Sequence, residues 1–161
     1  MNELDLDRCF WREVSTSPKF REWLIARTKF SGRNLELITD ELWHQRWYRD
    51  PETKRDSETD ILLIFREREG SKRYALHIEN KPAHRKWEID QAENYRKRAI
   101  NRMTPWNYVD FQIVLLAPTV FVKLYPDDVA HFDLVISYED VGTFIPEFVI
   151  DASTSAASNS N

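Results

Sequence analysis

The chain has 161 residues and a formal net charge of −4, which suits one domain with its own core and argues against a protein that coats nucleic acid nonspecifically. Its one cysteine, Cys9, excludes an internal disulfide and a cysteine-based zinc cluster, and it favours a reducing cytosol. Because no apolar run approaches the roughly 18 residues of a membrane helix and the N-terminus is acidic, we expect a cytoplasmic protein with no membrane partner.

The first predicted element, at residues 4–29, is helical. Apolar residues recur there near helical spacing, and Ser17 followed by Pro18 is typical of an N-cap with proline in the first turn. The pattern therefore predicts two short helices or one broken helix. Residues 31–34 predict a turn, whereas residues 35–59 fit neither a helix nor a strand clearly.

A β-hairpin is the clearest predicted element. Residues 61–65 are an apolar run, residues 66–72 alternate in charge through Gly70, and residues 74–78 are apolar again. Pro82 ends the second strand because it lacks a backbone N–H. The two strands should therefore run side by side, joined by a solvent-exposed turn.

The remaining predicted elements are an amphipathic helix, two strands and two short helices, at residues 87–103, 108–118, 132–138, 126–130 and 138–145. The order strand, helix, strand implies a right-handed crossover and at least one parallel strand pair. The Ser-, Ala- and Asn-rich residues at the C-terminus have little apolar surface to bury. We therefore expect one domain at residues 1–150 and a disordered tail at residues 151–161.

Asp60, Glu79 and Lys81 are the residues that say most about function. In a hairpin, an acid that begins the first strand meets an acid that ends the second. Two carboxylates and one amine in one pocket indicate phosphodiester hydrolysis with a divalent cation, and Mg²⁺, or Mn²⁺ in its place, prefers such oxygen ligands. Side chains alternate along a strand, so Asn80 should point away from this face and offer its backbone carbonyl as a further ligand.

The spacing of Glu79 and Lys81 is weak evidence by itself, because Glu52 and Lys54 repeat it. Glu52 lies in a polar stretch with no strand to direct its side chain. Glu79 ends an apolar strand, one hairpin's length after Asp60. We therefore expect Glu52 and Lys54 to be surface charges.

The predicted helix at residues 87–103 carries further candidates. Gln91 and Tyr95 are four residues apart, so they share a helix face and could reach toward the site, although a core tyrosine with a rim glutamine gives the same pattern. Basic residues also cluster after Glu79, either along a groove for nucleic acid or on a solvated helix face. The candidates for nucleic-acid contacts in this cluster are Arg85, Lys86, Arg98 and Arg102.

Three segments, in this order and at these distances, resemble the PD-(D/E)XK nuclease superfamily: Glu-Thr-Asp-Ile-Leu-Leu-Ile at 58–64, Ala-Leu-His-Ile-Glu-Asn-Lys at 75–81 and Gln-Ala-Glu-Asn-Tyr-Arg at 91–96. Later segments resemble uncharacterised bacterial members, so the resemblance covers roughly residues 57–142. It implies an α/β fold with a restriction-endonuclease-like αβββαβ core, a four-stranded mixed sheet flanked by helices. It also implies a Mg²⁺-dependent deoxyribonuclease, either an endonuclease or an exonuclease.

The resemblance also implies a role for each matching residue. Asp60 and Glu79 match the metal-binding acids, Lys81 matches the catalytic lysine, and Gln91 with Tyr95 matches an accessory pair of one branch. The family often adds a metal-binding acid from its first helix.

The candidate for that first-helix acid is Glu13, with Glu22 as a competitor. Two features depart from the family pattern. Thr59 precedes Asp60 where the family has proline, and only two of three expected antiparallel strands are clear before the helix. Residues 35–43 or a long strand at residues 115–124 would supply the third.

Two functions remain open. The first is a nuclease acting on DNA in phage defence, repair or processing of foreign DNA, with a homodimer or partner protein supplying specificity; RNA is not separated from DNA as a substrate. The second is a nuclease-like fold without catalysis that serves as a binding or scaffolding module. Net acidity and several aromatic residues favour that module: Trp43, Trp47, Tyr48 and Trp106. The intact pair of acids favours the enzyme, because gathering like charges costs free energy.

Overall fold

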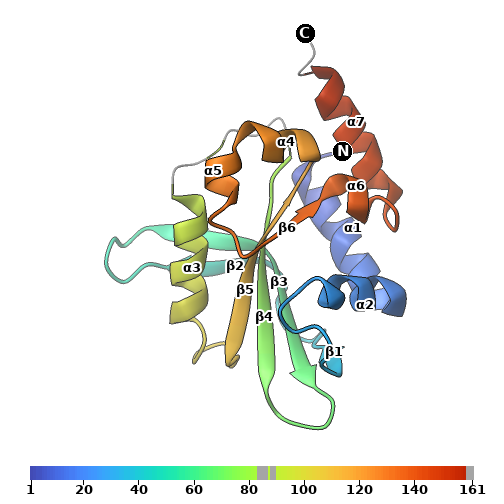
Figure 1. Ribbon diagram of the computed structural model, residues 1–161. Helices are drawn as coiled ribbons and strands as arrows, with labels where there is room; N and C mark the ends of the chain where they lie inside the picture. The colour runs from blue at the N-terminus through green and yellow to red at the C-terminus, as the bar shows by residue number, and fades with distance from the viewer. Residues whose placement is uncertain (83–86, 88–89, 159–161) are drawn as a thin grey trace.

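The computed structural model describes residues 1–82, 87 and 90–158. It is a mixed α/β protein in which helices flank a mixed sheet (Figure 1). The elements in chain order are α1 (Glu3–Thr16), α2 (Pro18–Ala26), β1 (Leu35–Leu37), β2 (His44–Arg49), β3 (Asp56–Glu67), β4 (Arg73–Asn80), α3 (Gln91–Asn101), β5 (Asp110–Ala117), α4 (Thr119–Leu124), α5 (Pro126–Val129), β6 (Leu134–Ser137), α6 (Tyr138–Val141) and α7 (Pro146–Ser158).

The sheet is organised around the long strand β3. Its strand order is β1-β3-β4-β5-β6, and β2 pairs with the first half of β3. The predicted hairpin is confirmed, because β3 and β4 pair antiparallel with Ile61 opposite Ile78. The predicted parallel pairing is confirmed as well, since β4 pairs with β5 in parallel and α3 connects these two strands.

Two strands lie in the region where the sequence pattern was ambiguous. β1 pairs antiparallel with the end of β3, with Leu35 opposite Glu67, so the extra strand expected from residues 35–43 is present. The long strand at residues 115–124 is wrong, because β5 ends at Ala117 and Pro118 precedes helix α4. The sheet therefore has six strands, two more than the four expected.

Helix boundaries follow local capping signals. Ser17 ends α1 and caps α2, and its hydroxyl accepts a hydrogen bond from the backbone N–H of Phe20 at 3.2 Å. Ser137 caps α6 in the same way and accepts from the N–H of Asp140 at 3.0 Å. The predicted helix break at Ser17 and the predicted cap at Ser137 are both confirmed.

The C-terminal segment differs from the expectation. We expected disorder from residue 151, but α7 continues through Ser158 and Ala152 is buried in the core. Alanine favours helix, and one buried face is enough to extend a helix that is already packed. The expected tail is therefore corrected for residues 151–158, whereas residues 159–161 lie outside the described part of the chain.

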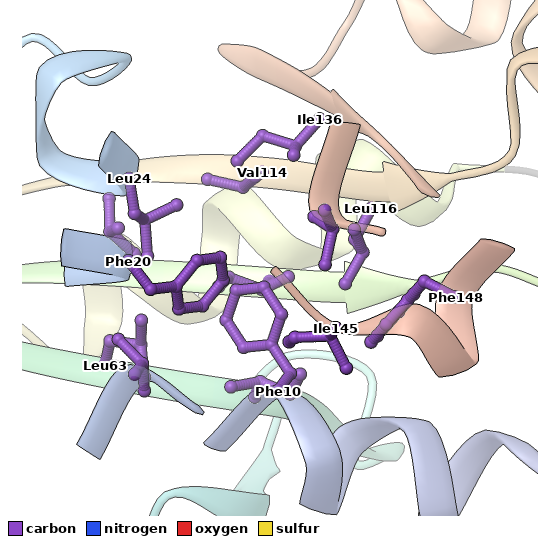
Figure 2. Packing of buried hydrophobic residues seen from close by; sticks show 14 of the residues in the cluster. Phe10, Phe20, Leu24, Leu63, Val114, Leu116, Ile136, Ile145 and Phe148 are labelled. Atoms are coloured by element: carbon purple, nitrogen blue, oxygen red, sulfur yellow. The ribbon is translucent and has the colours of Figure 1, made fainter. Parts of the chain in front are cut away.

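Two hydrophobic layers cover the sheet. On one face, α1, α2, α6 and α7 pack against the strands, and Figure 2 shows side chains from these elements converging, among them Phe10, Phe20, Leu63 and Phe148. On the other face, α3, α4 and α5 form a smaller cluster with β5. Each fully buried side chain of this size contributes about 1.5–3 kcal/mol to stability. Among the described residues, no helix combines the length and apolar character needed to cross a membrane.

Candidate functional site

The five residues predicted for catalysis line one cavity of about 290 Å³. Asp60 lies on β3, Glu79 lies near the end of β4, and Lys81 follows directly after β4; Gln91 and Tyr95 come from the first half of α3. The register that pairs Ile61 with Ile78 brings the start of β3 beside the end of β4. The hairpin and the helix after it therefore gather residues from three places in the sequence.

Lys81, Gln91 and Glu79 form a connected chain of polar groups. Lys81 Nζ donates to Gln91 Oε1 at 3.2 Å and lies 3.8 Å from Glu79 Oε1, while Gln91 Nε2 donates to the same Glu79 oxygen. The side chains of Lys81 and Glu79 are each only 7% exposed. The backbone N–H of Lys81 donates to Leu116 O at 2.8 Å, which fixes where this side chain begins.

Tyr95 ties α3 to the strand that carries Asp60. Its hydroxyl oxygen accepts a hydrogen bond from the backbone N–H of Asp60 at 3.2 Å, and its hydroxyl also bonds the carboxylate of Glu79. Burial raises the pKa of Tyr95, so it remains protonated at neutral pH. Tyr95 is buried, as expected if it is a core aromatic residue, yet it also lines the cavity of the candidate site.

The two carboxyl groups are held close together and away from water. Burial, followed by the charge of Glu79, raises the pKa of Asp60 well above its ordinary value. Burial likewise raises the pKa of Glu79, although hydrogen bonds from Tyr95 and Asp60 and the charge of Lys81 oppose this. Ionising both groups together is therefore costly unless a positive charge lies beside them.

Asn80 points away from the cavity, as strand alternation predicts. Its side-chain amide donates to Asp7 Oδ1 at 2.7 Å, and its amide oxygen accepts from the hydroxyl of Tyr138. Its backbone N–H donates to Asp60 Oδ2 at 3.0 Å. These bonds fix the peptide between Glu79 and Lys81, and the role of its carbonyl as a metal ligand stays a prediction.

The first helix brings different acids to the site from the one expected. Glu3 lines the cavity, and Asp7 is buried beside Asn80 with its other oxygen 3.1 Å from His44 Nε2. Glu13 lies ten residues beyond Glu3, roughly 15 Å along the helix, and it is not among the described residues that line the cavity. Glu22 lines a separate cavity near α2. Neither candidate for the first-helix acid is therefore among the described residues that line the cavity of Asp60 and Glu79.

A sequence signal for the first-helix acids exists in the helical spacing. Positions 3, 7, 10 and 14 share one face of α1, and Phe10 and Val14 on that face are buried. A buried polar residue within an apolar stripe is the informative exception. Asp7 is such a residue, and it could have been preferred to Glu13 on that ground.

The basic residues predicted to contact nucleic acid divide into three groups. Arg85 and Lys86 lie outside the described residues. Arg102 is half-buried, with its guanidinium over the rings of Tyr48 and Trp106 at 4.9 and 5.5 Å. Arg98 is only 1% exposed and lines the cavity, so the interpretation of a solvated helix face is wrong for this residue.

Three more acids line the cavity besides Asp60 and Glu79, namely Glu3, Asp56 and Glu58. Among the described residues, no group of three or more His, Cys, Asp or Glu side chains gathers closely enough to hold a metal ion. Any cation there would therefore complete its shell with water or backbone oxygen, as Mg²⁺ commonly does. The second Glu-x-Lys pair, Glu52 and Lys54, is exposed in the turn before β3, as expected.

The aromatic residues that favoured a binding module occupy different environments. Tyr48 is buried, and Trp43 stacks on Trp11 with ring centroids 5.0 Å apart. Trp106 is half-buried and lies under the guanidinium of Arg46 at 4.5 Å. Trp47, on β2, is 64% exposed.

Comparison of the chain with protein-family models, with curated proteins and with solved structures finds no match.

Proposed function

We propose that the chain is a metal-dependent nuclease that hydrolyses phosphodiester bonds in DNA. The observation that carries the proposal is the convergence of Asp60, Glu79 and Lys81 in one cavity, with Gln91 joining the last two. Two adjacent carboxylates and a buried lysine match the requirements of metal-assisted hydrolysis. Such an enzyme would suit phage defence, DNA repair or processing of foreign DNA.

The connectivity of the fold supports the same proposal. Helix α1 is followed by β1, by the antiparallel strands β3 and β4, and then by α3 and β5. We interpret this order as an αβββαβ core of the restriction-endonuclease type, with β2 and β6 as additions. In this interpretation the acids at the β3–β4 end and the pair on α3 would take the roles that the resemblance implies.

The residues present fit a divalent cation of the Mg²⁺ or Mn²⁺ type. Asp60 and Glu79 offer hard oxygen ligands, and their mutual repulsion in a buried place would be relieved by a cation between them. When bound, the cation supplies a polarised phosphate and a water of lowered pKa.

The surrounding residues then perform the remaining tasks. Lys81 holds its ammonium group beside Glu79, where it can orient the attacking water and offset negative charge that grows on the phosphate. Gln91 keeps Lys81 and Glu79 in register through one amide. Tyr95 fixes the backbone of Asp60, so the acid is positioned before substrate arrives.

The test is cleavage of linear, circular and single-stranded DNA and of RNA, with Mg²⁺, Mn²⁺ or chelator. Glu79→Gln should abolish cleavage, and Lys81→Ala should slow it by about 10²–10³-fold, the usual loss when one group that stabilises transition-state charge is removed. The second Glu-x-Lys pair supplies matched controls. Glu52→Gln and Lys54→Ala change the same residue types at exposed positions and should cleave like the native chain.

Three results would contradict the proposal. Cleavage in the presence of chelator would show that no metal is required. Cleavage by Glu79→Gln would show that the cavity is not the active site. Failure of the native chain to cut any of the four substrates, together with failure to bind a divalent cation, would favour the binding module instead. A preference for RNA would change the substrate and keep the chemistry.

A further inference from the structure

Arg98 occupies an unusual place on α3. It lines the cavity of Asp60 and Glu79, yet its side chain is only 1% exposed. Its Nε donates to Thr59 Oγ1 at 2.8 Å and its Nη1 donates to Ser57 Oγ at 2.5 Å. The guanidinium also lies over the ring of Tyr95 at 4.2 Å. Three groups, two hydroxyls and one aromatic ring, thus hold Arg98 in one orientation.

One nitrogen of this guanidinium is left without a partner. Nη2 of Arg98 is buried and makes no hydrogen bond within the described part of the chain. Among the described residues, no carboxylate lies within 4.0 Å of the Arg98 guanidinium, so Arg98 forms no ion pair with them. Nearby cations differ, because Lys81 pairs with Glu79 and Arg96 pairs with Asp133. Buried charges in proteins are normally paired, and a buried charged donor without an acceptor costs free energy.

The partners that Arg98 does have are neutral hydroxyls. Ser57 and Thr59 orient the guanidinium but leave its positive charge uncompensated. A guanidinium held in this way leaves Nη2 available to donate a charge-assisted hydrogen bond to a phosphate oxygen. The anion must approach with a cation, because acidic side chains also line the cavity: Glu3, Asp56, Glu58, Asp60 and Glu79.

We propose that Arg98 is the counter-charge for a phosphate group of the DNA strand, bound in this cavity beside the metal-binding acids. The inference rests on the proposed nuclease function and names the residue that holds the substrate backbone. Arg98 was a candidate for nucleic-acid contact as a member of an exposed basic cluster. Its burial instead places it where a phosphate next to the cleaved bond would lie.

The test is equilibrium binding of a short labelled DNA, single-stranded and duplex, with Ca²⁺ replacing Mg²⁺ to prevent hydrolysis. Arg98→Met should weaken binding by about 10- to 150-fold, the range expected when a hydrogen bond to a charged group worth about 1.5–3 kcal/mol is lost. The slope of log affinity against log salt should also fall by about 0.7–0.9, as expected when one phosphate contact is removed.

Two further variants separate this role from a structural one. Arg98→Lys keeps the positive charge but loses the planar guanidinium group, so it should keep the native salt slope and lose affinity. Arg66→Met removes a cation from the end of β3 away from Asp60, where Arg66 pairs with Glu36 at 2.5 Å, and should bind within about twofold of native. Thermal unfolding of each variant shows whether it is folded, and Arg98→Lys decides the question if Arg98→Met is not.

The outcomes distinguish this inference from the proposed function. If the native chain cuts DNA and Arg98→Met binds with native affinity and slope, the inference is overturned and the nuclease stands. If Arg98→Lys binds with native affinity as well as native slope, the guanidinium is not the phosphate contact. If the native chain neither cuts nor binds nucleic acid, both proposals fail together.

Discussion

Asp7, which is buried, and His44, which is half-buried, form a pair that connects α1 to β2 beside the candidate site. Burial raises the pKa of Asp7 to about 7, and burial lowers the pKa of His44. At neutral pH the pair therefore favours a protonated carboxyl next to a neutral imidazole over two full charges. The contact of 3.1 Å between them is accordingly a hydrogen bond more than an ion pair.

This pair predicts a pH dependence of stability. The pKa of Asp7 is raised on folding from 3.8 to about 7, so the folded chain binds an extra proton between these values and loses that stabilisation as pH rises through 7. Between pH 5 and pH 8 the loss amounts to about 2–3 kcal/mol. Asn does not titrate, so the Asp7→Asn variant should not lose this stability. Between pH 5 and pH 8 the free energy of unfolding of the variant, relative to that of the native chain, should therefore rise by the same amount. Parallel pH curves from urea unfolding of the two proteins would refute the assignment.

At the residue scale, the sequence located the site better than its surroundings. Asp60, Glu79 and Lys81 follow from hairpin geometry, because pairing and alternation are local rules. Asp7 and Arg98 do not follow, since their burial depends on how distant elements pack. The spacing of residues along a helix tells on which face a charged side chain lies. It does not tell whether another element covers that face.

Among the secondary-structure elements, those with capping residues or apolar runs were predicted from the sequence, whereas the polar strand β2 was not. Ser17 and Ser137 marked helix starts correctly because a cap is satisfied within four residues. Strand β2 was missed because its sequence His-Gln-Arg-Trp-Tyr-Arg alternates without an apolar side, and its one fully buried residue is Tyr48. Such a strand is held by pairing with β3, which is a tertiary effect.

The junction of α6 and α7 supplies a prediction at the element scale. Gly142 follows α6, and a Cβ added there would collide with the side chain of Val149 and lie 3.1 Å from Tyr138 O. Gly142→Ala should therefore destabilise the chain by about 1–3 kcal/mol through overpacking. In Gly70→Ala the nearest obstacle is the end of the flexible Glu67 side chain, so the change should stay within about 0.5 kcal/mol. Equal urea midpoints for the two variants would show that α7 does not pack against Gly142 as described.

In the molecule as a whole, the larger hydrophobic core and the candidate cavity occupy different regions around the sheet. The larger core lies on the side of α1, α2, α6 and α7 (Figure 1). The candidate cavity is lined by residues from α1, β3, the end of β4 and α3. The mixed sheet and its flanking helices were predictable from the order of apolar runs and helical patterns. The sheet size and the helical C-terminus were not, because each depends on pairing or packing with segments far away in the chain.

Titration of the chain with Mn²⁺ measures whether Asp60 and Glu79 together hold a divalent cation, as we propose. We expect Mn²⁺ binding to be weakened by more than about tenfold in both Asp60→Asn and Glu79→Gln and to be unchanged in Glu52→Gln. Equal Mn²⁺ binding by the native chain and Glu79→Gln, or no binding by the native chain, would contradict it.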